Sequence, residues 1–106
     1  MNNKFTDREK GFEKKFQMDE ELQFKIAARS NKYLGEWASS MLGKNEEETK
    51  NYIQEIIKSD LEEAGQEDVF RKIKKDFQIA LISIEETEIR NQIEKALSRA
   101  KEDFKK

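Results

Sequence analysis

Residues 19–42 read DEELQFKIAARSNKYLGEWASSML. The apolar side chains of this stretch recur mostly at three- and four-residue spacings, which place them on one face of an α-helix. Glu20 and Glu21 belong to the first turn, where carboxylates complement the helix dipole, and Gly43 is a typical C-terminal stop. The stretch therefore predicts an amphipathic helix that starts near Asp19. Its apolar face comprises Leu22, Ile26, Tyr33, Leu34, Trp37, Ala38 and Met41.

The next segment predicts a helix that begins after Asn45. Asn45 and Glu48 have the spacing of a capping box, in which each side chain accepts a hydrogen bond from the backbone N–H of the other residue. Gly65 is expected to end this helix. Its predicted apolar face is Ile53, Ile56, Ile57, Leu61 and Ala64.

Two shorter patterns complete the chain. Residues 67–80 predict a helix that buries Phe70, Ile73 and Phe77. Ser83 with Glu86 is a second capping-box spacing and predicts the start of a last helix. Because no segment alternates as a half-buried strand does and the loops are short, the sequence predicts an all-α, up-and-down four-helix bundle. The apolar face of the last helix is Ile89, Ile93, Ala96, Leu97, Ala100 and Phe104.

Composition excludes most enzyme classes. The 106 residues suit one domain, and the charged fraction of 42% with a net charge of −2 predicts a thin core and a strongly solvated surface. The chain has no His and no Cys, which excludes His-activated nucleophiles and most zinc or iron sites. Its glycines are isolated, so there is no phosphate-binding loop. We therefore expect a non-enzymatic protein with no metal or cofactor, and no direct insertion into a membrane.

The first sixteen residues, MNNKFTDREKGFEKKF, place phenylalanines among charged and polar residues. At ~100° per residue, Phe5, Phe12 and Phe16 fall within roughly 40° of one another on a helix. An isolated helix of this length is marginal in water, so the aromatic stripe has to pack on another surface. Both the chain's own bundle and a partner protein remain possible at this point.

Local signals in the same segment predict its conformation. Thr6 with Glu9 is a capping-box spacing, so that Asp7 opens a helix. Gly11 lowers the stability of that helix by ~1 kcal/mol relative to Ala. The segment is therefore expected to become helical when it is held by a surface.

The compact basic cluster Arg71, Lys72, Lys74 and Lys75 is the best candidate for nucleic-acid binding. The chain lacks a strongly basic face, so a solvated helix surface is the favoured explanation and no nucleic-acid partner is expected. Two functions stay open from the residues alone. One is a helical adaptor, and the other is a bundle that senses an anionic metabolite such as a nucleotide, bound weakly through surface lysines and Arg71.

Three strings of the sequence resemble a known family. They are DREKGFEKKF at 7–16, DEELQFKIAARSNKYLGEWA at 19–38 and EEAGQEDVFRK at 62–72. These blocks, in this order, are similar to the zeta-subunit family of α-proteobacteria, small all-helical inhibitors of the F-type ATP synthase. The resemblance runs through roughly residues 5–75, and the last helix matches the family in its residue pattern only.

The resemblance implies a four-helix bundle over 19–106 and a mobile, partly helical inhibitory segment over 1–18. In that family the segment becomes helical as it enters an interface between the α and β subunits of the catalytic head and reaches the γ subunit, which blocks rotation in the hydrolysing direction. The resemblance also implies a cytoplasmic protein, peripheral to the inner membrane through the ATP synthase. The implied partner-binding residues are Phe5, Phe12 and Phe16 as apolar anchors, with Asp7, Arg8, Glu9 and Lys10 as polar contacts.

Overall fold

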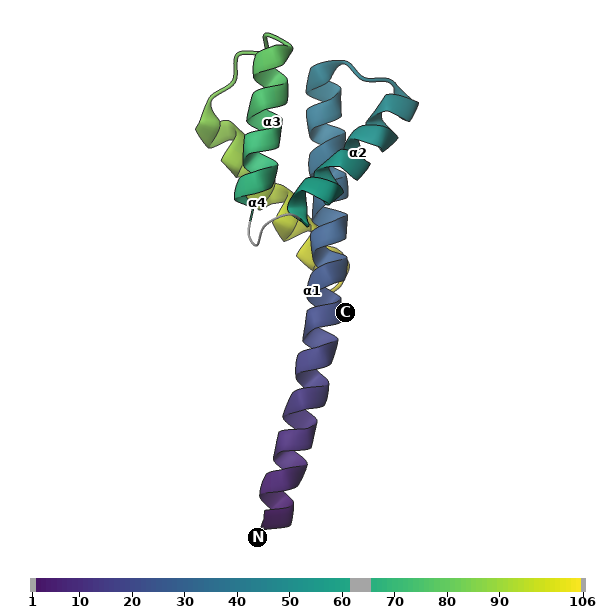
Figure 1. Ribbon diagram of the computed structural model, residues 1–106, viewed down its shortest axis with the longest axis vertical. Coiled ribbons are helices and arrows are strands. Elements are labelled where there is room, and N and C mark those ends of the chain that lie inside the picture. Colours follow the sequence, from purple (N-terminus) through teal and green to yellow (C-terminus); the bar gives the residue numbers. More distant parts are fainter. Residues whose placement is uncertain (1, 62–65, 106) are drawn as a thin grey trace.

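The computed structural model describes the backbone of residues 2–61 and 66–105 and the side chains of residues 20–61 and 66–105. These ranges contain four helices and no strand: α1 (Asn2–Leu42), α2 (Glu46–Asp60), α3 (Glu67–Ile79) and α4 (Glu86–Asp103). The helices run alternately up and down, and α1 and α3 each pack against both α2 and α4 (Figure 1). The predicted all-α four-helix bundle is confirmed.

Helix α1 begins at Asn2, so the predicted helix starts at Asp7 and Asp19 are wrong. The two predicted helices are one continuous helix because the chain has no Pro to interrupt it, and a lone Gly11 costs only ~1 kcal/mol. A 41-residue helix is ~62 Å long at 1.5 Å per residue, which accounts for the 65 Å long dimension of the molecule. Figure 1 shows the N-terminal half of α1 projecting alone from the bundle. The mobility of residues 1–18 and the domain boundary after residue 18 stay predictions.

The core joins all four helices around Phe77, Ile73, Leu34 and Ile56, each at most 2% exposed. Trp37 packs on Phe77 with a ring-centroid distance of 5.5 Å, which links α1 to α3. The helical periodicity identified most of the core face of each helix, but Met41, which was predicted on the apolar face of α1, is 43% exposed. The buried core residues are Leu34, Ala38, Tyr52, Ile56, Val69, Phe70, Ile73, Phe77, Ile89, Ile93 and Ala96.

The predicted capping box of α2 is confirmed. The Glu48 backbone N–H donates to Asn45 Oδ1 at 2.8 Å, and the Asn45 backbone N–H donates to Glu48 Oε1 at 2.9 Å. Helix α2 ends at Asp60, and Leu61, predicted to lie on its apolar face, is 70% exposed. The predicted Ala64 and Gly65 positions lie outside the described residues.

Helix α3 ends in a Schellman motif, where the connection to α4 begins. The Ile82 N–H donates to the Phe77 carbonyl at 2.8 Å, and the Leu81 N–H donates to the Gln78 carbonyl at 3.1 Å. Leu81 occupies the left-handed position, with φ 60°, that Gly usually takes in this motif.

The predicted capping box of Ser83 with Glu86 is wrong. Glu85 is the N-cap of α4, and its side chain makes no capping hydrogen bond. Ile82 and Ile84 both pack against the core. This alternate-residue packing requires extended backbone, which delays the start of α4 to Glu86.

Leu81→Gly is expected to raise the free energy of unfolding by about 0.5–1 kcal/mol. A left-handed conformation costs a residue with a Cβ ~1–2 kcal/mol, part of which the extra freedom of Gly in the unfolded chain offsets. The Leu81 side chain is 91% exposed, so little packing is lost. Urea unfolding followed by circular dichroism measures the change. Leu81→Ala is the control, because it keeps the Cβ and should give no gain; a destabilised Leu81→Gly variant would contradict the strain argument.

Candidate partner-binding surfaces

The projecting part of α1 is the first candidate surface. Among the side chains described from Glu20 onward, Ile26 is the first buried residue of α1. Residues 2–25 therefore form a rod of ~36 Å at 1.5 Å per residue. The helical backbone that the aromatic-stripe prediction requires is present. The side chains of the predicted contacts, Phe5, Asp7, Arg8, Glu9, Lys10, Phe12 and Phe16, lie outside the described side chains.

A polar cluster fastens the end of α4 to α1 close to the base of this rod. The Tyr33 hydroxyl donates to Asp103 Oδ2, and Arg29 Nη1 also donates to Asp103 Oδ2 at 3.2 Å. The hydrogen bond from Tyr33, followed by that from Arg29, holds the pKa of Asp103 below its usual range. The Arg29 guanidinium also lies 5.2 Å from the centre of the Phe104 ring. Charge and stacking together fix the C-terminal end of the bundle.

Acidification is expected to remove the contribution of Asp103 to stability. Because the pKa of Asp103 is lower in the folded state, its stabilising effect is complete above the unfolded value of ~3.9 and is lost as pH falls through the lower folded value. The difference in melting temperature between the wild type and Asp103→Asn should therefore stay constant from pH 7 to 5 and shrink below about pH 4. A difference that grows on acidification would contradict this assignment. Circular dichroism melts at each pH provide the measurement.

An open groove lies between α1, α2 and the C-terminal end, and we name it the foot groove. Its volume is about 370 Å³. Apolar side chains form most of its surface, and its charged lining residues are all cations. The apolar residues are Phe24, Ala28, Ile53, Ile57 and Phe104; Gln54 and the cations Lys25, Arg29 and Lys32 complete the lining.

A second cleft, between α1 and α4, is much smaller. Its volume is about 140 Å³, and it is lined by Trp37, Lys95 and Arg99 among others. The Arg99 guanidinium lies 3.9 Å from the centre of the Tyr33 ring. Small-molecule sites usually start at ~300 Å³, so this cleft could take a phosphate-sized group but not a whole nucleotide.

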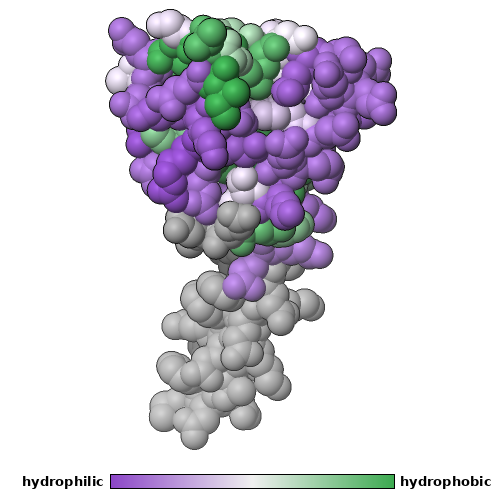
Figure 2. Space-filling model, turned by 45° about the horizontal axis from the view of Figure 1, so that its top comes forward, coloured by the Kyte–Doolittle hydropathy of each residue, from purple (hydrophilic) through white to green (hydrophobic). Residues whose placement is uncertain are grey.

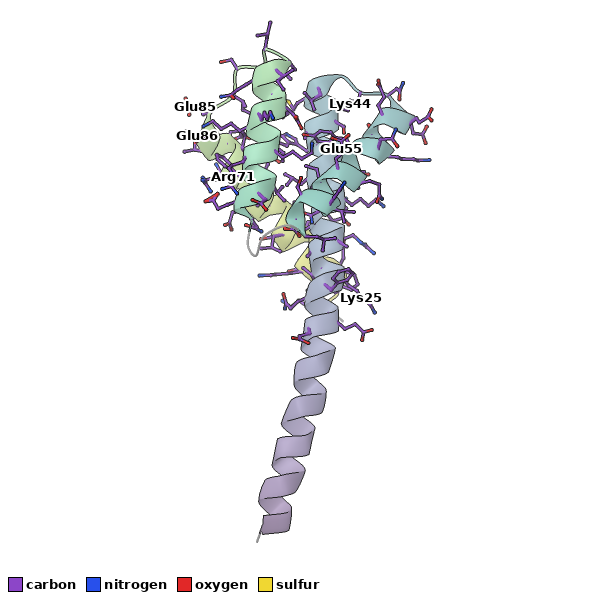
Figure 3. All side chains as sticks on the ribbon, in the orientation of Figure 1. Lys25, Lys44, Glu55, Arg71, Glu85 and Glu86 are labelled. Carbon is purple, nitrogen blue, oxygen red and sulfur yellow. The ribbon has the colours of Figure 1, made fainter. Side chains whose placement is uncertain are left out.

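The basic cluster on α3 is largely neutralised by carboxylates. Arg71 pairs with Asp68, and Lys74 Nζ lies 3.1 Å from Glu86 Oε1. Lys72 Nζ lies 2.8 Å from Glu55 Oε1 and 3.0 Å from Asp76 Oδ2. Figure 3 shows Arg71, Glu55 and Glu86 on the bundle, away from the projecting rod. This pairing favours the prediction of a solvated helix surface and weakens the proposed role of Arg71 in binding an anion.

A buried polar contact between α2 and α3 was missed by the sequence analysis. The Tyr52 hydroxyl donates to Asp76 Oδ2 at 2.8 Å, and Tyr52 is only 3% exposed. Burial, and then the hydrogen bond to Asp76, raise the pKa of Tyr52. Partial burial opposes the shift at Lys72, but hydrogen bonds to Glu55 and Asp76 raise its pKa overall. Tyr52 lies one turn before Ile56, a spacing from which its burial could have been predicted.

The far end of the bundle carries exposed apolar residues. Figure 2 shows an apolar patch at the end opposite the projecting rod. Met41 lies at the end of α1, Ile79 is the last residue of α3 and Leu81 follows that helix; their side chains are 43%, 71% and 91% exposed. Within the described ranges, no helix is long and apolar enough to cross a membrane. Nor do the acidic side chains of those ranges form a group that could hold a metal ion.

Comparisons with known proteins point to one family. A family model described as ATPase inhibitor subunit zeta matches residues 1–103. A solved structure, described as a solution NMR structure, is 41% identical in sequence. Its alignment covers 76% of this chain and 92% of that chain, with a TM-score of 0.68. The comparison with curated proteins gives no match.

Proposed function

The chain belongs to the ATPase inhibitor subunit zeta family, and from this premise we propose that it inhibits ATP hydrolysis by an F-type ATP synthase. In this proposal the N-terminal segment, residues 1–18, enters an interface between the α and β subunits of the catalytic head and reaches the γ subunit. Rotation in the hydrolysing direction is then blocked, and the protein acts as a regulatory subunit rather than as an enzyme. The protein would lie in the cytoplasm, held at the inner membrane by its binding to the ATP synthase.

The observation that carries the proposal is the projecting half of α1. Its ~36 Å length allows the first residues to enter a partner while the bundle stays outside. A helical segment also loses less conformational entropy on binding than a disordered one. The bundle would keep the segment at a high effective concentration near its site once either part has bound.

Phe5, Phe12 and Phe16 would be the apolar anchors of the segment on the partner. On a continuous helix these positions share one face, and a narrow stripe of anchors is typical of a helix that binds in a groove. Asp7, Arg8, Glu9 and Lys10 would make polar contacts at the edges of that groove. Residues 1–18 carry a net charge of +2, which would assist approach to an acidic partner surface.

Removing residues 1–16 is expected to abolish inhibition of ATP hydrolysis. The bundle core starts at Ile26, so the truncated protein should keep its melting temperature and the fluorescence of Trp37, its single tryptophan. The measurement is the rate of ATP hydrolysis by the purified catalytic head with increasing inhibitor. A matched control keeps the length and composition of residues 1–16 but scrambles their order, so that the phenylalanines no longer share a face. Equal inhibition by the truncated protein would overturn the proposal, and a full-length protein that binds without inhibiting would be an adaptor.

Within the segment, Phe12→Ala tests the anchor at the centre of the stripe. A buried aromatic anchor contributes ~1–3 kcal/mol, so binding should weaken roughly 5- to 150-fold. A change of less than twofold would remove Phe12 from the set of anchors.

A further inference from the structure

The foot groove has the shape of a surface that receives another helix. Gly35 lies where α1 crosses α2, because a Cβ placed there would be 2.7 Å from Ile53 Cγ1. The lining residues Phe24 to Lys32 precede this crossing on α1, and they span two turns, ~12 Å. Apolar positions repeat at four-residue intervals on both walls, Phe24 with Ala28 and Ile53 with Ile57. The groove is open to solvent, which suits an elongated helix better than an enclosed small molecule.

Phe24 is the clearest sign that this surface has no partner among the described residues. Its side chain is 65% exposed although it lines the groove. Burial of an aromatic ring is favourable because it removes a large apolar surface from water. A helix that covered Phe24 together with Ile53 and Ile57 would therefore remove a continuous apolar strip from water.

The charge around the groove selects the chemistry of that helix. Lys25 and Lys32 have no carboxylate partner among the described side chains, and Figure 3 shows Lys25 where α1 leaves the bundle. The nearest carboxylates along α1 are Glu21, one turn before Lys25, and Glu36, one turn after Lys32. On the other wall, Lys50 and Lys58 lie one turn either side of Gln54 but outside the groove lining, and Glu46 and Glu47 lie one turn before Lys50. Arg29 is neutralised by Asp103, and exposed Lys105 follows Phe104.

We propose that the foot groove binds an amphipathic helix of a partner protein, with an apolar stripe flanked by Asp and Glu residues. The stripe covers Phe24, Ile53 and Ile57, and the flanking carboxylates pair with Lys25 and Lys32. Such a contact would give the bundle a binding site of its own, separate from the N-terminal segment. It is independent of the inhibitory role proposed above.

The test uses the full-length protein labelled with ¹⁵N and two synthetic peptides. Both are fourteen-residue helices with leucine at positions 2, 6, 9 and 13; one has glutamate and the other lysine at the flanking positions. We expect the glutamate peptide to shift the amide signals of Phe24–Lys32 and Ile53–Lys58 and the lysine peptide to leave them unchanged. Lys25→Glu with Lys32→Glu, or Phe24→Ala alone, should weaken binding at least tenfold. The matched control, Lys75→Glu with Lys95→Glu, makes the same change of net charge on α3 and α4 and should bind as the wild type does.

Several outcomes would overturn the proposal. Equal binding of both peptides would show that the groove does not select acidic flanking residues. Weaker binding of the glutamate peptide to the control variant would show that the net charge of the protein, and not the groove, determines binding. Groove shifts that depend on protein concentration without peptide would identify a second copy of the chain as the occupant. Shifts caused by phosphatidylglycerol vesicles but not by the glutamate peptide would identify a lipid surface instead. None of these results touches the proposed inhibition, because the titration contains no ATPase.

Discussion

Phe77→Ala is expected to lower the free energy of unfolding by about 3–5 kcal/mol, the usual cost of emptying a buried phenylalanine site. Phe77 is 1% exposed and packs against Trp37, so its removal leaves a cavity where α1 meets α3. Four helices joined by short loops cannot refill that cavity without moving their backbones. Because domains of this size have a total stability of ~5–15 kcal/mol, this loss removes a large fraction of the stability of the protein.

Urea unfolding followed by circular dichroism and by Trp37 fluorescence measures this loss. Phe24→Ala removes the same side chain from a site that is 65% exposed, and it should change stability by less than ~0.5 kcal/mol. The two variants together separate the packing of a buried ring from the general effect of losing a phenylalanine. A Phe77→Ala variant as stable as Phe24→Ala would show that the core is not organised around Phe77.

Asp76→Ala is expected to cost about 1.5–3 kcal/mol, the range for a hydrogen bond to a charged group. The substitution leaves the buried Tyr52 hydroxyl without its acceptor and removes one of the two carboxylates that face Lys72. Both effects weaken the contact between α2 and α3. The melting temperature should fall while the helix content at 20 °C stays the same.

A double-mutant cycle isolates the hydrogen bond. Tyr52→Phe should be destabilising in the wild type and nearly neutral in Asp76→Ala, because the acceptor is then already absent. Glu86→Ala is the control, since its ion pair with Lys74 joins side chains that are 60% and 40% exposed and should be worth less than ~1 kcal/mol. Equal costs of Tyr52→Phe in the two backgrounds would show that Tyr52 and Asp76 are not coupled.

The core residues and helix ends show which features of the fold could be predicted from the sequence and which could not. Periodicity identified Phe70, Ile73 and Phe77 as core residues, and the Asn45–Glu48 spacing identified the start of α2, because both signals depend on neighbours within one turn. The same spacing rule failed at Ser83, where the packing of Ile82 and Ile84 on the core competes with a helix start. Local signals also predicted helix starts at Asp7 and Asp19, both inside the first half of α1. A helix-start signal does not show that the preceding residues are non-helical, and this stretch has no Pro to interrupt a helix.

The sequence by itself determined the all-α class, most of the apolar face of each bundle helix and the absence of histidine and cysteine chemistry. It also identified the family, because blocks of similar residues recur in order along the chain. The tertiary structure decided which surfaces stay free. The foot groove combines residues from α1, α2 and the position after α4, and its cations come together only when Gly35 lets two helices cross closely. The physical reason is distance: periodicity records contacts one turn apart, whereas a groove depends on residues that are far apart in the chain and brought together by packing.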